Sequence, residues 1–156
     1  MKDFFISYNK ADRAWAEWIA WVLEETGCSA VIQAWDFRPG ENFVLRMHEA
    51  AAQTQQTIAV LSEDYLGAEY TLPEWAAAFA QDPEGKRRVL IPMRVRQCEL
   101  KGLLSTIIHI DLIGLSEERA RQAIFEGLAV RGKPAHAPTF PAVDQGTLSG
   151  IERPIK

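Results

Sequence analysis

Glu74 draws attention in this sequence because a lone carboxylate in its position favours glycosidic chemistry. It follows an apolar run at residues 57–61 that predicts a buried strand, and it falls in the first turn of an alanine-rich helix expected from residue 72. In open α/β sheets, ligands bind outside the carboxyl ends of the strands. A carboxylate there can hold ribose hydroxyls, stabilise an oxocarbenium-like transition state or trap it covalently. A cationic leaving group such as nicotinamide departs without a general acid, so one carboxylate would be enough.

Side chains able to bind a nucleotide are expected near this glutamate, at the strand ends. They are Tyr8, Lys10, Trp35, Asp36, Phe37, Arg38, Ser62 and Tyr70. Aromatic rings can sandwich a planar ring, and Lys10 and Arg38 can contact phosphates. Trp35 and Phe37 fall in an expected loop at residues 35–41, where apolar side chains are costly unless they contact something. Taken alone, Tyr8 and Tyr70 also fit packing roles, and the two cations also fit a solvated surface.

A structural role for Glu74 is also consistent with its local sequence. Residues 71–74 read TLPE, which fits a capping box with threonine at the N-cap, proline in the first turn and glutamate at the third position. The spacing alone favours this cap over catalysis. The two roles do not exclude each other, because the first turn of the helix faces the crevice.

The order of the elements predicts an α/β fold with a parallel sheet and right-handed crossovers. Strands are expected at residues 3–8, 29–34, 57–61, 89–95 and 106–111. Asn9, Asn42 and Ser116 are expected to cap the helices between and after them. The helix after Asn42 is expected to run to about residue 54. Its predicted buried side chains are Val44, Met47 and Ala51. Pro92 inside the fourth strand removes a ladder donor and predicts a bulge or a lateral strand.

Composition limits the function classes. The chain has 156 residues, 47% of them hydrophobic, which suits one globular domain at residues 1–131. The proline- and glycine-rich residues 132–156 predict a linker or tail leading to further domains of a longer protein. The net charge of −4 argues against nucleic-acid binding. No window of 18 apolar residues predicts a membrane span, and the expected compartment is the cytoplasm. The spacing of the two cysteines, Cys28 and Cys98, predicts no metal site.

Three common nucleotide and signalling folds fit poorly. The turn after the first strand reads SYNKAD at residues 7–12 and lacks a glycine-rich phosphate fingerprint, which disfavours a dinucleotide-binding domain and a P-loop ATPase. A response-regulator receiver would need acidic residues at the strand ends, where this chain has Ser7, Tyr8 and Ser62.

Three motifs together resemble the TIR (Toll/interleukin-1 receptor) domain family, most closely its bacterial members. FFISY at residues 4–8 is similar to box 1, WDFRPG at residues 35–40 is similar to the BB loop of box 2, and IAVLS at residues 58–62 precedes the helix with the glutamate. The similarity covers about residues 1–130. It implies a flavodoxin-like fold with a five-stranded parallel sheet of order 2-1-3-4-5.

The resemblance also implies function. In enzymatic members a glutamate on the helix after the third strand is essential for cleaving NAD+ to nicotinamide and ADP-ribose or a cyclic isomer, and Glu74 matches it. Tyr8 and Lys10 match substrate contacts, and Asp36 matches the box 2 aspartate. Tyr70 stands where bacterial members often have tryptophan, and Trp35 where many have arginine. The expected partners are NAD+, as substrate and not as cofactor, and other TIR domains that assemble through the BB loop.

Two alternatives to this enzyme remain open. The first is a scaffold without catalysis that recruits TIR domains through the BB loop. Deoxyribosyl transfer between nucleosides, on a related fold, is a more distant one. A role in antiphage immunity is an expectation from the family.

Overall fold

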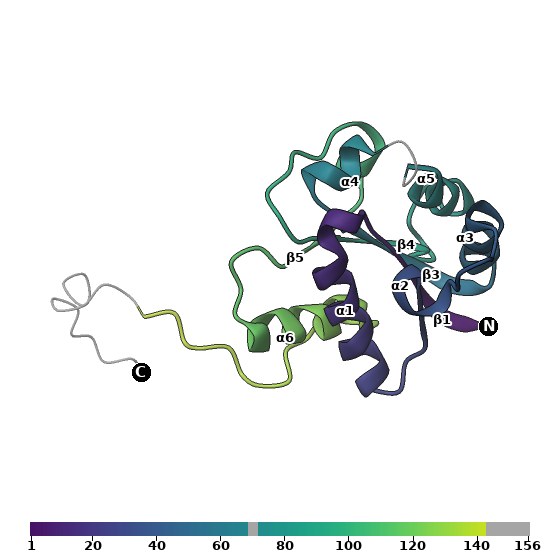
Figure 1. Ribbon diagram of the computed structural model, residues 1–156. Coiled ribbons are helices and arrows are strands. Elements are labelled where there is room, and N and C mark those ends of the chain that lie inside the picture. The colour runs from purple at the N-terminus through teal and green to yellow at the C-terminus, as the bar shows by residue number, and fades with distance from the viewer. Residues whose placement is uncertain (69–71, 143–156) are drawn as a thin grey trace, which may run out of the picture.

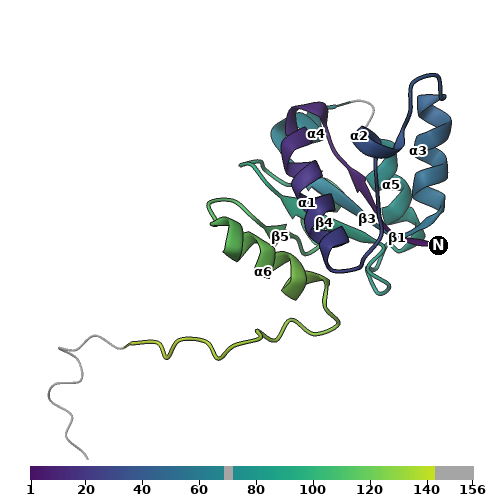
Figure 2. The same cartoon turned by 60° about the horizontal axis from the view of Figure 1, so that its bottom comes forward.

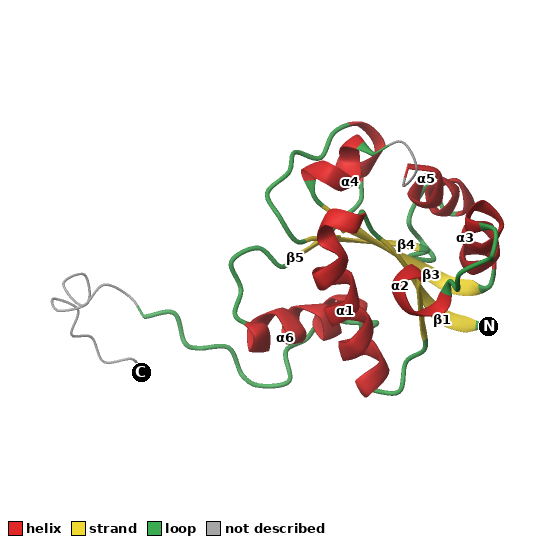
Figure 3. Ribbon diagram, in the orientation of Figure 1, coloured by secondary structure: helices red, strands yellow, loops and turns green. Residues whose placement is uncertain are grey.

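The computed structural model describes residues 1–68 and 72–142, and for residues 72–75 it describes the backbone alone. Five parallel strands form one sheet in the order β2-β1-β3-β4-β5, as the resemblance implies. The strands are β1 (Lys2–Ser7), β2 (Ala30–Ile32), β3 (Thr54–Leu61), β4 (Leu90–Arg94) and β5 (Ile110–Asp111). Figure 3 shows them as a twisted layer with helices around it.

Helices cover both faces of the sheet. The α-helices are α1 (Arg13–Glu25), α2 (Gln33–Asp36), α3 (Phe43–Ala52), α4 (Glu63–Gly67), α5 (Leu72–Gln81) and α6 (Glu117–Leu128), and short 3-10 turns are η1 (Lys10–Asp12) and η2 (Gly102–Thr106). Figures 1 and 2 show α1 and α6 on one side of the sheet, and α3 and α5 on the other.

The core follows the alternation of side chains along the central strands. Phe4, Ile6, Ile58 and Val60 point to the side of α1 and α6. Phe5 packs with α3 on the opposite face, and Ala59 and Leu61 pack there with α4 and α5. Because both faces of β1 and β3 are covered, these strands are nearly continuous apolar runs.

Several sequence expectations need correction. Asn9 caps η1 and not α1, because a single 3-10 turn precedes the helix. The second strand ends at Ile32, where α2 begins. Asn42 does cap α3 and Ser116 does cap α6. In α3, Met47 is buried as expected, but Val44 is exposed and Ala50 is buried instead. The helix starts with three apolar residues in a row, so the pattern alone did not show which of them faces the core.

Pro92 lies at a position of β4 where a backbone N–H would have no partner strand to donate to, so the proline costs the sheet no hydrogen bond. The register of β4 with β3 is continuous from Leu90 to Arg94, so there is no bulge. Val89 and Val95 bond to β3, whereas Arg94 accepts from Leu112 on the other side. Because backbone groups alternate along a strand, Pro92 turns its nitrogen toward β5, whose pairing starts one residue later, at Met93. The strand is thus not lateral, since β4 lies between β3 and β5, but Pro92 itself lies ahead of the pairing with β5.

Asp82 fixes the turn between α5 and β4 and supplies a testable pH dependence. Its carboxylate accepts from the amides of Arg87 (3.0 Å) and Val89 (3.2 Å). Burial pushes the pKa of Asp82 up, but these bonds outweigh it, so its pKa lies below the usual value. Folded protein therefore binds this proton less readily than unfolded protein does, and the stabilisation is present above the usual aspartate pKa and lost as the pH falls through and below it.

We expect Asp82→Asn to flatten the fall of the melting temperature between pH 6 and pH 3. Glu84→Gln is the matched control, because Glu84 is an exposed carboxylate of the same turn. Calorimetric melts of both variants and the wild type across this range give the comparison. An equal slope for Asp82→Asn and the wild type would contradict the assignment.

Beyond α6 the chain leaves the sheet. Residues 129–142 form no helix or strand, and Figures 1 and 2 show them extending away from the body of the fold. Within the described residues, no helix has both the length and the hydrophobicity to cross a membrane.

Candidate functional site at the carboxyl ends of β1 and β3

The chain reverses its direction of sheet growth between β1 and β3. From β1 it crosses through α1 to β2 on one side, and β3 then pairs on the other side of β1. In flavodoxin-like sheets this switch point is where ligands bind, outside the carboxyl ends of the two strands. We call the region outside these two strand ends the β1/β3 crevice. Residues 8–12, which follow β1, form its β1 wall, and α4, which follows β3, forms its β3 wall.

Tyr8 and Lys10 lie on the β1 wall, as predicted. Tyr8 is half-buried and packs against the main core cluster. Burial raises the pKa of its hydroxyl, although the amide of Ala34 donates a hydrogen bond that acts in the opposite direction. The hydroxyl is therefore neutral at physiological pH. Lys10 is exposed in η1 and available for an anion.

The box 2 segment begins with a helical turn where its sequence predicts a loop. Trp35 and Asp36 belong to α2 and not to a loop. The indole Nε1 of Trp35 donates to Glu17 Oε2 on α1 at 2.7 Å, and the Asp36 carboxylate accepts from the Ile32 amide at 2.8 Å. The expected loop is thus wrong at Trp35, whose ring is half-buried against the main core.

Phe37 is also half-buried, whereas Arg38 is exposed. The Phe37 ring contacts Phe43 edge to face, with centroids 6.2 Å apart, and the Arg46 guanidinium lies 4.9 Å from its centroid. The exposed Arg38 is tied through its backbone amide, which donates to Glu41 at 2.7 Å. Trp35 and Phe37 therefore serve the local fold in this conformation.

Ser62 is completely buried and acts as a helix cap. Its hydroxyl accepts from the Tyr65 amide at 3.1 Å, capping α4, and donates to Asp12 Oδ2 at 2.5 Å. Ser7 Oγ lies 3.0 Å from the Tyr65 hydroxyl, which joins the ends of β1 and α4 a second time. The hydrogen bonds of these hydroxyls therefore join the β1 wall of the crevice to α4.

Sequence reasoning missed Asp12 and Arg96 as parts of this site. Asp12 is 1% exposed, and its carboxylate accepts from Arg96 Nε at 2.7 Å as well as from Ser62. Arg96 also donates to Asp64 Oδ2 at 2.5 Å. Asp12 resembled an ordinary residue of a helix start, and Arg96 lies 84 residues further on, so no local pattern connected them.

Glu74 lies in the first turn of α5, at the position that sequence reasoning assigned to it. Its side chain is outside the described residues, and so is the whole of Tyr70. Their predicted roles therefore remain predictions.

The family of the chain follows from its sequence as a whole. The family model described as the TIR domain matches residues 4–125, which is most of the chain and contains the sheet and nearly all of α6. The chain belongs to the TIR domain family. No curated protein matches it significantly.

Solved structures agree with the TIR fold. The TIR domain of the Toll-related receptor TRR-2 from Hydra magnipapillata superposes with a TM-score of 0.68 at 22% identity, covering 82% of this chain and 95% of that one. The TIR domains of the activated Roq1 resistosome give 0.67 at 13% identity, covering 83% and 100%. A TIR-STING receptor from C. gigas, in complex with 2',3'-cGAMP, gives 0.63 at 26% identity and covers 84% of this chain, which spans only 39% of the receptor's length.

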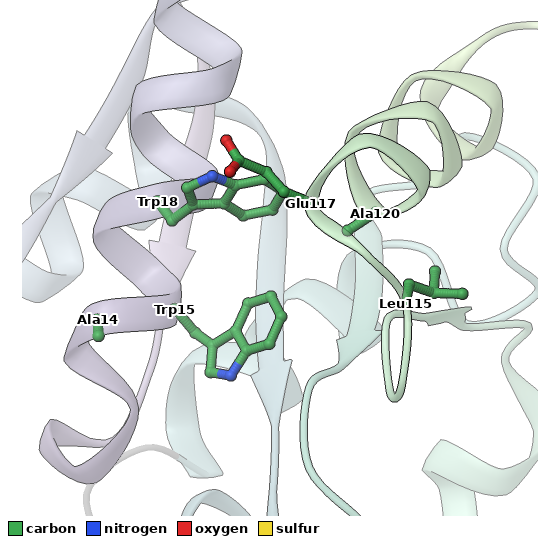
Figure 4. A pocket seen from close by; sticks show the side chains of 6 residues that line it. All are labelled: Ala14, Trp15, Trp18, Leu115, Glu117 and Ala120. Carbon is green, nitrogen blue, oxygen red and sulfur yellow. The ribbon is translucent and has the colours of Figure 1, made fainter.

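This TIR domain has hollows away from the β1/β3 crevice. One, of about 350 Å³, lies between α1 and α6, where the indoles of Trp15 and Trp18 project toward Leu115, Glu117 and Ala120 (Figure 4). The two rings meet edge to face at 5.9 Å. Another, of about 670 Å³, lies beside Cys98 and His109 near the ends of β4 and β5. Neither hollow is lined by Tyr8 or Lys10.

Proposed function

We propose that this TIR domain cleaves NAD+ at the glycosidic bond of the nicotinamide ribose, releasing nicotinamide and ADP-ribose or a cyclic ADP-ribose isomer. The observation that carries the proposal is the position of residue 74. Helix α5 begins at Leu72, after β3 and α4, so the backbone of Glu74 belongs to the first turn of that helix. This supports a role for Glu74 at the strand ends, where ligands bind in open α/β sheets. Tyr8 and Lys10 follow β1 at the same edge of the sheet.

The reaction requires little beyond one carboxylate and a binding site. The bond between ribose C1′ and the pyridinium nitrogen breaks, and its electron pair neutralises the nitrogen, so nicotinamide leaves without a proton. Glu74 would stabilise the positive charge that develops on the ribose. Water then bonds to C1′ and releases its proton to solvent, or a nitrogen of the adenine attacks instead and closes a ring. Tyr8 would contact a planar ring, and Lys10 the pyrophosphate.

The test is nicotinamide release by the purified protein, followed by chromatography with mass detection. We expect release that rises steeply with protein concentration, in step with association seen by light scattering. Release that is absent even where light scattering shows large assemblies would reject the enzyme and favour the scaffold.

Self-association is the second part of the proposal, and an exposed apolar patch supports it. Phe43, Val44 and Leu45 at the start of α3 are 43%, 61% and 58% exposed and lie close behind Arg38 in the chain. A contiguous exposed apolar patch is typical of a protein interface. Trp21, on the outer side of α1, is also exposed. The Roq1 resistosome is an assembly that contains TIR domains. We propose that homotypic assembly switches on turnover in a longer parent protein with a fused sensor domain, in bacterial immune signalling.

We expect Val44→Glu to prevent association and to remove the steep concentration dependence of turnover. A carboxylate is compatible with the first turn of α3, because the helix dipole favours it there, so the melting temperature should stay within a few degrees. Val130→Glu is the matched control, because Val130 is fully exposed beyond α6. Light scattering and the nicotinamide assay measure both effects. Unchanged association in Val44→Glu would remove this patch from the interface.

A further inference from the structure

Arg96 connects three strand ends across the β1/β3 crevice. It follows β4, and its guanidinium donates to Asp12, which follows β1, and to Asp64, which follows β3. The two bonds are 2.7 Å and 2.5 Å long and use different nitrogens, Nε and Nη2. One side chain therefore links both walls of the crevice.

The buried end of this arrangement depends on Arg96. The Asp12 side chain is removed from solvent, and a buried carboxylate is strongly unfavourable unless it is paired and hydrogen-bonded. Its two oxygens are used by different partners, Oδ1 by Arg96 and Oδ2 by Ser62. Since Ser62 also caps α4, a shift of Asp12 would be transmitted to the β3 wall.

We infer that Arg96 is a positioning residue that holds the two walls of the β1/β3 crevice together and thereby sets the affinity of the site for its ligand. The inference rests on the proposed function for the identity of that ligand, NAD+. Asp12, in η1 with Lys10, carries the effect to the β1 wall, and Asp64 carries it to α4.

The charges argue against Arg96 as the contact for the pyrophosphate. One guanidinium faces two carboxylates, so the group as a whole is negative and repels an anion. The hydrogen bonds that Arg96 donates to Asp12 first, and then to Asp64, raise the pKa of Arg96, so it stays charged. Lys10, which is exposed, remains a cation available to the phosphates.

The chain contains a matched control for Arg96. Arg121 also bridges two carboxylates on different elements, with Nη1 2.7 Å from Glu25 on α1 and Nη2 3.7 Å from Glu117 on α6. Its side chain is exposed to a similar degree, 36% against 45% for Arg96. It lies on the helix layer and not at the crevice. Its two carboxylate partners are exposed, 44% and 72%, so Arg121→Met controls for the loss of an arginine and two ionic contacts without leaving a buried carboxylate unpaired.

The experiment compares Arg96→Met, Arg96→Lys, Asp64→Ala and Arg121→Met. For Arg96→Met we expect KM for NAD+ to rise about tenfold or more, with kcat within about threefold of the wild type, because small displacements of binding groups are costly. Arg96→Lys should be intermediate, since lysine keeps the charge but cannot form both bonds in the same geometry. Asp64→Ala leaves the buried pair with Asp12 intact, so it should fold, and KM should rise about threefold. Arg121→Met should leave KM unchanged.

Hydrogen exchange separates the inference from the proposed function. We expect the amides of residues 9–12 and of Tyr65 to exchange faster in Arg96→Met than in the wild type or Arg121→Met. An unchanged KM in Arg96→Met and Asp64→Ala, or an equal rise in Arg121→Met, would overturn the inference. If the wild type releases no nicotinamide, the proposed function fails by itself. In that case, unchanged exchange at residues 9–12 in Arg96→Met would also overturn the inference that Arg96 holds the two walls together. Faster exchange there would support it.

Discussion

Glu74→Gln is expected to lower the rate of nicotinamide release by about 10²–10³-fold or more. A neutral amide has the shape of the carboxylate but cannot stabilise the positive charge that develops on the ribose. The same amide can still accept a capping-box bond at the start of α5, so the melting temperature should change little. Chromatographic assay of nicotinamide and a thermal melt on the same sample measure both effects.

Glu84→Gln is the control for this substitution, because Glu84 is an exposed glutamate in the turn after α5. It should keep full activity and stability. A Glu74→Gln protein with wild-type turnover would show that Glu74 is not catalytic. A protein that loses activity and melting temperature together would identify Glu74 as a helix cap.

Trp35→Ala is expected to lower the free energy of unfolding by about 2–3 kcal/mol, which is less than the cost for a fully buried tryptophan because the ring is half-buried. The substitution removes packing against the main core and leaves Glu17 without the indole N–H that it accepts at 2.7 Å. Urea denaturation followed by circular dichroism measures the loss.

Arg38→Ala is the neighbouring control. Arg38 is exposed and is held by its backbone amide, which alanine keeps, so stability should stay within about 0.5 kcal/mol of the wild type. A Trp35→Ala protein as stable as the wild type would mean that the indole is free to leave α1 and contact another subunit. If Trp35→Ala is destabilised as expected, its failure to assemble says nothing about an interface, and Val44→Glu and Arg38→Ala are the informative variants.

Local signals explain what could be predicted of the fold. Continuous apolar runs predicted the strands, because burial on both faces of a parallel sheet requires such runs, and apolar stripes of helical period predicted the helices between them. Asn42 and Ser116 were correctly identified as caps, since each bonds to an amide three residues away. Residue 74 was assigned to the first turn of its helix for the same local reason.

Contacts between distant parts of the chain explain what could not be predicted. The single turn of α2 is stabilised by the hydrogen bond that Trp35 donates to Glu17, 18 residues earlier. A second bond, from the Ile32 amide to the Asp36 carboxylate, stabilises it locally. The link of Asp12 to Arg96 spans 84 residues. Charged side chains at both ends of such a link resemble ordinary surface residues until the fold brings them together. The candidate site was therefore found by motif, while the residues that hold its walls were found only in three dimensions.

Pro92 has a consequence for a protein that is proposed to assemble. Strand edges with free N–H groups are templates for indiscriminate pairing, which leads to aggregation. In β4 the backbone nitrogen of Pro92 points toward the β5 side of the sheet, one residue before the pairing with β5 begins. Because it belongs to a proline, it has no N–H to donate to an added strand. A second chain could not extend the sheet there in regular register, even if the two-residue strand β5 detached. Growth by strand addition is therefore disfavoured on the β5 side of the sheet, which leaves the short strand β2 as the other edge.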